Sequence, residues 1–296
     1  MPTPASRLLG IYGNLFQDTH LPDIASLLRH LSTIGFGLAV EQDFRDYLLN
    51  SGEELPDTDV APPTHAPSAC GAVVSFGGDG TFLHAACWTR GNEIPILGVN
   101  TGTLGYLAAF SLDDPHAIGE ALLGRGCRVE PRAAISLKCD AMPAEVWPFA
   151  LNEVAVLKAE TAGMIVVRAR LDGQYLTDYQ GDGLIVATPT GSTGYNLSVG
   201  GPILQPTLPA FTLAPVAPHS LTQRPLTVSS ESEIELKAES RDATYRVSLD
   251  GRSFTLTVKT GSILHLRRAP FVVPVVVRAS DNFAATLRAK LHWGRP

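Results

Sequence analysis

Residues 73–86 read VVSFGGDGTFLHAA, a short apolar run that ends on glycines and one aspartate. Glycine after a strand lets the backbone turn sharply and approach a ligand closely. In an open parallel sheet, ligands bind beyond the carboxyl ends of the strands. We therefore predict that strand 72–76 belongs to a parallel sheet. A ligand-binding loop follows it, and then a helix over residues 81–90.

The first 126 residues alternate between strand-like and helix-like segments. Apolar residues recur at helical spacing from Ile24 to Ile34, and Asp18 or Thr19 is the expected cap of that helix. Such alternation is typical of a doubly wound α/β sheet. Residues 52–68 contain four prolines and are expected to form a surface loop. The other expected elements are strands 8–12, 37–40 and 94–99 and a helix over 113–123.

From about residue 127 the pattern becomes that of a β-rich domain. Residues 164–179 alternate apolar and polar side chains around Asp172–Gly173, and residues 247–258 do the same around Asp250–Gly251. Alternation on both sides of an Asp-Gly pair is typical of a β-hairpin.

The chain therefore divides into two predicted domains. A Rossmann-like α/β nucleotide-binding domain comprises residues 1–126, and a β-rich domain comprises residues 127–277. The tail, residues 278–296, contains a helix with Ser280 or Asp281 as its cap, and this helix is expected to return to the first domain.

Composition excludes several classes of protein. Hydrophobic residues make up 45% of the chain, and the formal net charge is −6. That charge disfavours a general nucleic-acid binder, whereas a nucleotide stays possible because backbone N–H groups can hold phosphates. We expect no membrane span and no secretory signal, since long apolar runs are missing. The four cysteines lack metal-ligand spacing, as in a cytoplasmic protein with reduced thiols.

The loop at residues 77–81 is suited to binding phosphate. Gly77, Gly78 and Gly80 can expose backbone N–H groups beside the N-terminus of a helix that starts near Thr81. The spacing matches neither the dinucleotide fingerprint nor a Walker loop. Asp79 would repel phosphate, so a carboxylate here indicates a proton acceptor for a hydroxyl group or a metal ligand. The alternative is a tight glycine turn with a capping aspartate.

Two further stretches extend this pattern. NTGTLGYLA at residues 100–108 is a second glycine-rich segment at the end of a strand. YQGDGLIVATPTGSTGYNLSVGGPIL at residues 179–204 places Asp182 before an apolar strand, and hydroxyl side chains and Tyr195 follow that strand. Hydroxyl groups and exposed backbone suit a ribose, and an aromatic ring can stack on a base. Ordinary turns and a surface loop are the alternatives.

Together these residues resemble the NAD kinase family. The resemblance implies an α/β domain followed by a β-rich, NAD-binding domain. It extends in order over most of the chain, through GGDGT at 77–81, NTGTLGYL at 100–107, NEV at 152–154, GDGLIVATPTGSTGY at 181–195 with NLSVGGPI to 203, and PHSLTQRP at 218–225.

The resemblance implies transfer of a phosphoryl group from ATP to the 2′-hydroxyl of the adenosine ribose of NAD, which gives NADP. Asp79 would be the base, and Gly77, Gly78 and Thr81 would hold the phosphate donor. Mg²⁺ would arrive with ATP rather than on protein ligands. His219 and Arg252 are possible further contacts. The implied NAD-binding residues are Asp79, Gly80, Asn152, Glu153, Asp182, Thr193, Gly194, Tyr195, Asn196 and Ser198. The implied assembly is a homodimer or homotetramer whose NAD site a neighbouring subunit completes.

Two departures and two alternatives stay open. The chain has TGYN at 193–196 where the family commonly has TAYS, and an arginine at position 252, often glutamine in the family, would favour a phosphate. A lipid kinase of the diacylglycerol or sphingoid type shares GGDGT. It is disfavoured because Asn152 and Glu153 lie far downstream of that loop and no lipid-anchoring segment is seen. A non-catalytic dinucleotide sensor would have no need of Asp79.

Overall fold

The computed structural model describes residues 6–102, 105–159, 163–240 and 243–291. The chain divides into two compact units, Met1–Pro131 with Val273–Pro296 as unit 1 and Arg132–Val272 as unit 2. Within the described ranges, no helix is long and apolar enough to cross a membrane.

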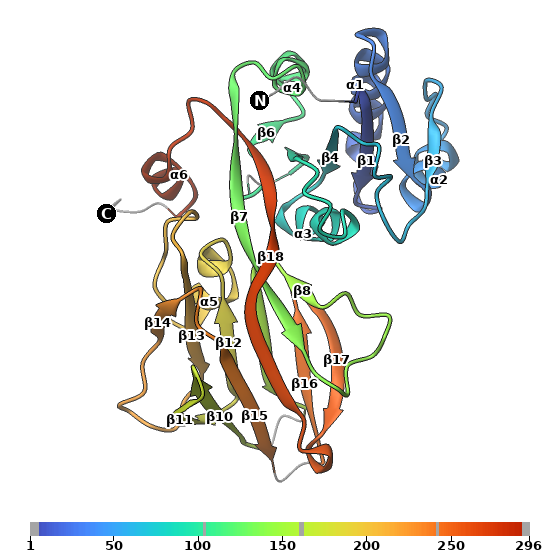
Figure 1. The fold of residues 1–296 in the computed structure, drawn as a ribbon. Coiled ribbons are helices and arrows are strands. Elements are labelled where there is room, and N and C mark those ends of the chain that lie inside the picture. Colours follow the sequence, from blue (N-terminus) through green and yellow to red (C-terminus); the bar gives the residue numbers. More distant parts are fainter. Residues whose placement is uncertain (1–5, 103–104, 160–162, 241–242, 292–296) are drawn as a thin grey trace. The chain divides into compact units, whose positions relative to one another are not determined.

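Unit 1 is built on a parallel sheet (Figure 1), with strand order β5-β4-β1-β2-β3. Strand β6 and the end of β18 extend it by pairing with β5, also in parallel. The strands are β1 (Leu8–Gly13), β2 (Gly37–Glu41), β3 (Asp59–Ala61), β4 (Ala72–Phe76), β5 (Ile96–Asn100), β6 (Phe110–Ser111) and β18 (Ile263–Arg278). The helices are α1 (Leu21–Thr33), α2 (Gln42–Asn50), α3 (Asp79–Trp88), α4 (Pro115–Leu122) and α6 (Phe283–Lys290).

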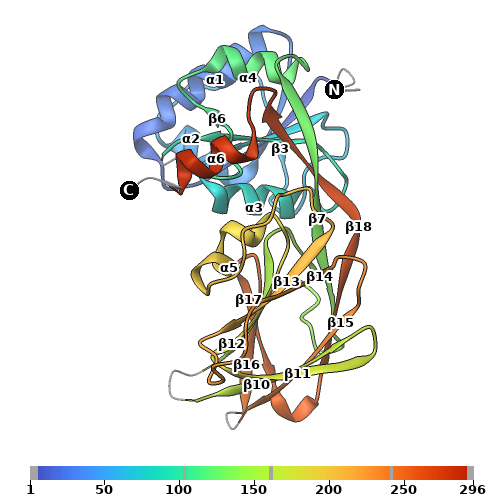
Figure 2. The same cartoon turned by 90° about the vertical axis from the view of Figure 1, so that its left-hand side faces the viewer.

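Helices cover both faces of this sheet. Leu9 and Ile11 of β1 belong to the apolar cluster that contains buried residues of α1, α2 and α4. The alternate residue Tyr12 points the other way, and its ring centre lies 5.5 Å from that of Trp88 in α3. Figure 2 shows α1 and α4 on one side of the sheet and α3 on the other. All five residues of β4 are buried, as expected for a strand covered on both faces. The predicted Rossmann-like α/β fold of the N-terminal part is confirmed.

Unit 2 is a sandwich of two antiparallel sheets (Figure 2). One has the order β11-β10-β15-β18-β7-β8, and the other has the order β14-β13-β12-β9-β16-β17. Inward-facing residues of both sheets, such as Val167 and Val186, share one buried cluster. The strands are β7 (Cys127–Lys138), β8 (Phe149–Ala150), β9 (Glu153–Lys158), β10 (Ile165–Leu171), β11 (Gln174–Gly181), β12 (Gly183–Ala187), β13 (Ala210–Val216), β14 (Leu226–Ser229), β15 (Ile234–Ser240), β16 (Thr244–Leu249) and β17 (Arg252–Thr257).

Both predicted hairpins are present in unit 2. Strands β10 and β11 pair across Asp172–Gly173, and β16 and β17 pair across Asp250–Gly251. Backbone φ is 50° at Asp172 and 75° at Gly173, and it is 49° at Asp250 and 82° at Gly251. Two successive positive φ angles are the geometry that an Asp-Gly pair favours in a two-residue hairpin turn.

Several predicted helix ends were wrong. Asp18 and Thr19 do not cap α1 but form a 3₁₀ turn with His20, and Asp18 instead accepts a hydrogen bond from the Tyr47 hydroxyl. The C-terminal helix is capped neither by Ser280 nor by Asp281. Its cap is Asn282, which accepts a 2.8 Å bond from the Ala285 N–H.

Two further differences concern residues 42–81. Helix α3 begins at Asp79 and not near Thr81, so the catalytic candidate lies in its first turn. Sequence reasoning missed α2 (42–50) and placed β3 (59–61) inside a loop. Strand β3 is only three residues long. Prolines at positions 56, 62 and 63 flank it, so the local pattern resembles that of a loop.

Strand β5 lies so close to residues 107–108 that position 98 requires glycine. A Cβ on Gly98 would lie 2.8 Å from the Ala108 Cα and 3.0 Å from the Leu107 carbonyl oxygen, and backbone cannot yield cheaply. We expect Gly98→Ala to destabilise the protein by about 2 kcal/mol, measured as a lower midpoint of thermal denaturation. Gly37→Ala, in strand β2 with only an ordinary contact at 3.4 Å, is the control and should leave the midpoint nearly unchanged. An equal effect of both variants would contradict this account.

Candidate active site

Asp79 joins the two glycine-rich segments of unit 1. Its Oδ2 accepts a 2.7 Å hydrogen bond from the Tyr106 N–H, and its Oδ1 accepts a 2.8 Å bond from the Leu107 N–H. A Cβ at Gly105 would lie 2.0 Å from Asp79 Oδ1, so this contact requires glycine there. Asp79 is therefore not the capping residue of a simple turn, because its carboxylate binds a different segment. The role of Gly105 was missed, although its motif was recognised.

The GGDG loop presents the start of α3 at the carboxyl end of β4. Gly77 has φ 147°, and a Cβ there would lie 2.3 Å from the Thr81 hydroxyl oxygen. The N-cap residue of α3 is Gly78, so no side chain caps the first N–H groups of the helix. A Cβ on Gly78 or Gly80 would have no atom within 4 Å. The first N–H groups of a helix lack partners within it and attract anions. This loop is thus open enough for phosphates to approach its backbone.

Gln17 connects the neighbouring strand ends. Its buried side chain donates a 2.8 Å bond to the Asn14 carbonyl oxygen after β1, and its Oε1 accepts a 2.8 Å bond from the Thr101 hydroxyl after β5. The Asn14 N–H in turn donates to the Phe76 carbonyl oxygen at the end of β4. Sequence reasoning missed Gln17, because nothing in its local pattern distinguishes it from an exposed glutamine.

In unit 2, Asp250 fixes the backbone at Asn152 and Glu153. The Asp250 carboxylate accepts bonds of 2.7, 2.8 and 3.1 Å from the N–H groups of Leu151, Asn152 and Glu153. Burial raises the pKa of Asp250, while these hydrogen bonds lower it. The Asp-Gly hairpin signal indicated a turn here, and the sequence contained no sign that its carboxylate would organise a second segment.

Asn152 and Glu153 hold buried polar atoms that have no partner among the described residues. These atoms are Oδ1 of Asn152 and Oε2 of Glu153. Burial, and then the nearby Asp250 charge, raises the pKa of Glu153 to about 7. Buried polar atoms are normally hydrogen-bonded, and an acid with a strongly shifted pKa is a functional-site candidate. This pair is therefore the strongest ligand-binding candidate in unit 2.

The segment that follows β12, predicted from the sequence to be a binding loop, lies against this pair. A Cβ on Gly194 would lie 3.5 Å from Asn152 Nδ2 and 3.6 Å from Glu153 Oε2, and one on Gly191 would lie 2.2 Å from the Asn152 carbonyl oxygen. The Tyr195 side chain is 39% exposed at the start of helix α5 (Tyr195–Ser198). The structure thus brings Asn152 and Glu153 together with Gly191 and Gly194.

Other predicted contacts are engaged within the protein. Asn196 is fully buried, and its amide donates to the carbonyl oxygens of Ser192 and Pro202 at 3.1 and 3.0 Å. This amide therefore ties the loop together. The Thr193 hydroxyl donates over 3.5 Å to the Thr190 carbonyl oxygen, and Ser198 is exposed.

Asp182, His219 and Arg252 have different surroundings. Asp182 Oδ1 lies 2.6 Å from Lys158 Nζ in an ion pair, and His219 is exposed. The Arg252 guanidinium donates to the carbonyl oxygens of Trp147 and Phe149 at 3.0 and 2.5 Å. It also lies 5.7 Å from the centre of the Trp147 ring. The guanidinium of Arg252 is thus held by backbone carbonyl oxygens of unit 2, and its effect on phosphate binding stays a prediction.

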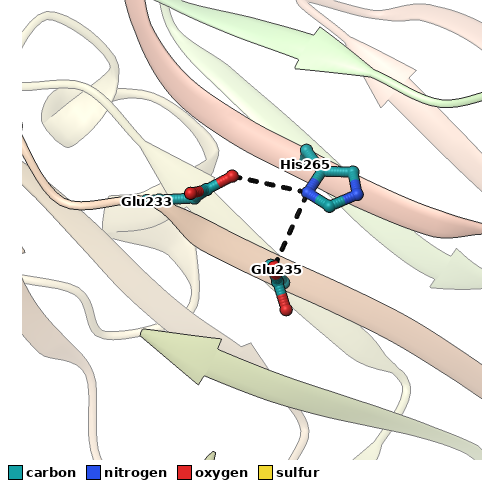
Figure 3. A group of neighbouring side chains, drawn as sticks. All are labelled: Glu233, Glu235 and His265. Atoms are coloured by element: carbon teal, nitrogen blue, oxygen red, sulfur yellow. Dashed lines mark ion pairs between the residues drawn. The ribbon is translucent and has the colours of Figure 1, made fainter. Parts of the chain in front are cut away.

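One group of three possible metal ligands occurs among the described residues, formed by Glu233, Glu235 and His265 (Figure 3). His265 Nδ1 lies 3.5 and 3.8 Å from the nearer carboxylate oxygens of Glu233 and Glu235. The other oxygens pair with guanidinium groups, Glu233 with Arg267 at 2.5 Å and Glu235 with Arg170 at 3.5 Å. Because the two arginines already neutralise the two carboxylates, we assign this group to a surface ion-pair cluster.

Comparisons with known proteins agree on one family. The model of the ATP-NAD kinase N-terminal domain matches residues 19–124, and that of the ATP-NAD kinase C-terminal domain matches residues 151–278. An NAD kinase from Bacteroides fragilis is 40% identical over 285 residues, which cover 96% of this chain and 97% of the relative. An NAD kinase from Flavobacterium psychrophilum is 36% identical over 290 residues, which cover 97% and 98%.

Solved structures agree with these sequence matches. An NAD kinase from Archaeoglobus fulgidus, in complex with ATP, is 30% identical with a TM-score of 0.71, and the match covers 96% of this chain and 98% of that one. Yeast NADH kinase complexed with NADH shares the fold, with a TM-score of 0.85 at 20% identity over 100% of this chain and 89% of that one. The resemblance inferred from the glycine-rich motifs is confirmed, and this chain belongs to the ATP-NAD kinase family.

Proposed function

We propose that this chain transfers the terminal phosphoryl group of ATP to the 2′-hydroxyl of the adenosine ribose of NAD, giving NADP. The observation that carries the proposal is the position of Asp79. In a chain similar over its full length to NAD kinases, this carboxylate lies at the carboxyl end of the parallel sheet, in the first turn of α3. The GGDG loop beside it is suited to hold the donor phosphates.

Asp79 acts as the proton acceptor in this proposal. Its two bonds to the N–H groups of Tyr106 and Leu107 use only part of its capacity, because a carboxylate has about four acceptor positions. The 2′-oxygen of the ribose attacks the terminal phosphorus of ATP, the bond from that phosphorus to the ADP oxygen breaks, and the hydroxyl proton moves to Asp79. Phosphoryl transfer depends mainly on positioning and charge stabilisation, which a fixed carboxylate and fixed N–H groups supply.

Asn152 and Glu153 bind NAD in this proposal. Their unpartnered buried oxygens can accept hydrogen bonds from ribose hydroxyls or a base amine. The exposed ring of Tyr195 offers a stacking surface. Gly80, Asp182, Thr193, Gly194, Asn196 and Ser198 stay proposed neighbours of the dinucleotide, with Asn196 acting through the loop it ties together.

Magnesium fits this site as a companion of ATP. Among the described residues, Asp79 belongs to no group of three carboxylate, histidine or cysteine ligands. Mg²⁺ usually binds to substrate phosphates and waters with few protein ligands, so ATP can bring the ion to a site that has no dedicated metal ligands. When bound, the ion neutralises charge on the phosphates. Assembly into a homodimer or homotetramer stays a prediction.

Replacing the proton acceptor tests the reaction itself. We expect Asp79→Asn to reduce NADP formation from NAD and Mg-ATP by about 10²- to 10⁴-fold, as typical for loss of a general base. NADP is quantified by chromatography, and the thermal denaturation midpoint of each protein serves as the folding control. Turnover near that of the wild type would remove Asp79 from its role. NADP formation by neither protein would favour the dinucleotide-sensor alternative.

The raised pKa of Glu153 predicts a pH-dependent cost in stability. Below pH 4.5, the ordinary value, the group is neutral in both the folded and unfolded states, and its effect vanishes. Between pH 4.5 and about 7 the unfolded chain loses this proton more readily, so the folded state is progressively destabilised, by about 3 kcal/mol in all.

Glu153→Gln removes that cost. We expect the variant to be more thermostable than the wild type at pH 8, with the difference shrinking towards pH 5. Thermal denaturation from pH 5 to pH 8 measures this. Glu145→Gln, at an exposed glutamate of unit 2, is the control and should show no such trend. A difference between Glu153→Gln and the wild type that does not depend on pH would contradict the prediction.

Asp250 is expected to act on NAD through Asn152 and Glu153. Asp250→Asn removes a carboxylate that accepts three backbone N–H bonds. We expect NAD affinity to fall about 10-fold or more, with little change in the KM for ATP. Asp172→Asn alters the matching turn residue of the other hairpin and is the control. Calorimetric titration with NAD measures the change, and equal behaviour of the two variants would refute the positioning role.

A further inference from the structure

The C-terminal helix brings an ammonium group next to the Asp79 segment. The chain leading into α6 is anchored within unit 1, where the Ala279 N–H donates to the Gly126 carbonyl oxygen at 2.9 Å. In the last turn of α6, Lys290 Nζ lies 5.0 Å from the centre of the Tyr106 ring. The Tyr106 N–H donates to Asp79. Helix α6, Tyr106 and Asp79 therefore form one contiguous group.

Among the described residues, no carboxylate lies within ion-pair distance of the Lys290 ammonium group. Burial lowers the pKa of Lys290, and the charges of Asp79 and Asp281 act in the opposite direction. The third group that faces it is Tyr106, whose own pKa is raised by burial and then by Asp79. A partly buried cation without a paired anion is costly to maintain, which indicates that an anionic ligand completes this site.

The proposed reaction supplies such an anion at this place. A base that takes the proton of the attacking hydroxyl lies within a few ångströms of the phosphorus that this oxygen attacks. The transferred phosphoryl group carries negative charge on its three outer oxygens, and Asp79 repels that charge. The N-terminus of α3 offsets about half a unit charge. The Lys290 ammonium group interacts electrostatically with Asp79, so it is well placed to offset the remaining negative charge of the phosphoryl group.

We propose that Lys290 of the C-terminal helix binds the phosphates of the phosphoryl donor beside Asp79. The inference rests on the proposed function, because that reaction is what brings a phosphate chain to Asp79. It assigns α6 a part in donor binding that none of the glycine-rich motifs contains. The cation–π contact with Tyr106 holds the ammonium group in position until the donor arrives.

Charge-altering substitutions at position 290 test this role. Lys290→Met keeps an unbranched apolar side chain and removes the charge, whereas Lys290→Arg retains a cation that can also stack on Tyr106. The matched control is Arg288→Met, which removes a charge from an exposed position of the same helix. We expect kcat/KM for Mg-ATP to fall about 100-fold in Lys290→Met, with the KM for NAD nearly unchanged. Lys290→Arg should recover most of the loss, and Arg288→Met should resemble the wild type.

Binding of Mg-ATP, measured by calorimetric titration without NAD, separates this inference from the proposed function. If the wild type makes NADP and Lys290→Met matches it in kcat/KM and in Mg-ATP affinity, the role of Lys290 is overturned and the function stands. If no protein makes NADP but Lys290→Met binds Mg-ATP more weakly than Arg288→Met, the function fails and the role of Lys290 stands. The role of Lys290 would also be overturned if Lys290→Met lost affinity for ATP and NAD equally and had a lowered denaturation midpoint. Absence of Mg-ATP binding by the wild type would overturn it as well.

Discussion

The bonds from the Tyr106 and Leu107 N–H groups to the Asp79 carboxylate are the contact on which the proposed chemistry of unit 1 depends. They hold the loop after β4 against the segment after β5, and they leave part of the carboxylate free for a substrate hydroxyl. The contact requires glycine at position 105, because any Cβ would collide with the carboxylate. The glycine-rich motifs thus have two purposes, since some glycines leave space for phosphates and others let backbone reach Asp79.

Unit 2 uses the same physical device for a different purpose. There the Asp250 carboxylate accepts three successive backbone N–H bonds and fixes the turn that carries Asn152 and Glu153. This turn leaves Oε2 of Glu153 buried without a hydrogen-bond partner among the described residues, and burial raises the pKa of this carboxyl group to about 7. A binding site is expected to lower the stability of the free protein, because its polar atoms are arranged to hydrogen-bond a ligand and do not hydrogen-bond one another.

Sequence reasoning succeeded where a local pattern determines the structure. The buried β4, its glycine-rich end and the two Asp-Gly hairpins follow from burial and backbone conformation alone. It failed where the partner of a side chain lies far along the chain. Asp18 and Asp281 look like helix caps, yet Asp18 bonds to Tyr47 and the cap of α6 is Asn282. Likewise, the long-range partners of Asp250, Arg252 and Lys290 decide their roles, and no spacing rule specifies those partners.

The most direct test of the account is a crystal structure with NAD and a non-hydrolysable ATP analogue bound together. We expect one Asp79 carboxylate oxygen to lie within hydrogen-bond distance of the ribose 2′-oxygen, at about 2.6–3.2 Å. The terminal phosphate of the analogue should lie in line with that oxygen, and the bonds from Tyr106 and Leu107 should be retained. A 2′-oxygen bound to a different group, with Asp79 out of reach, would contradict the central claim.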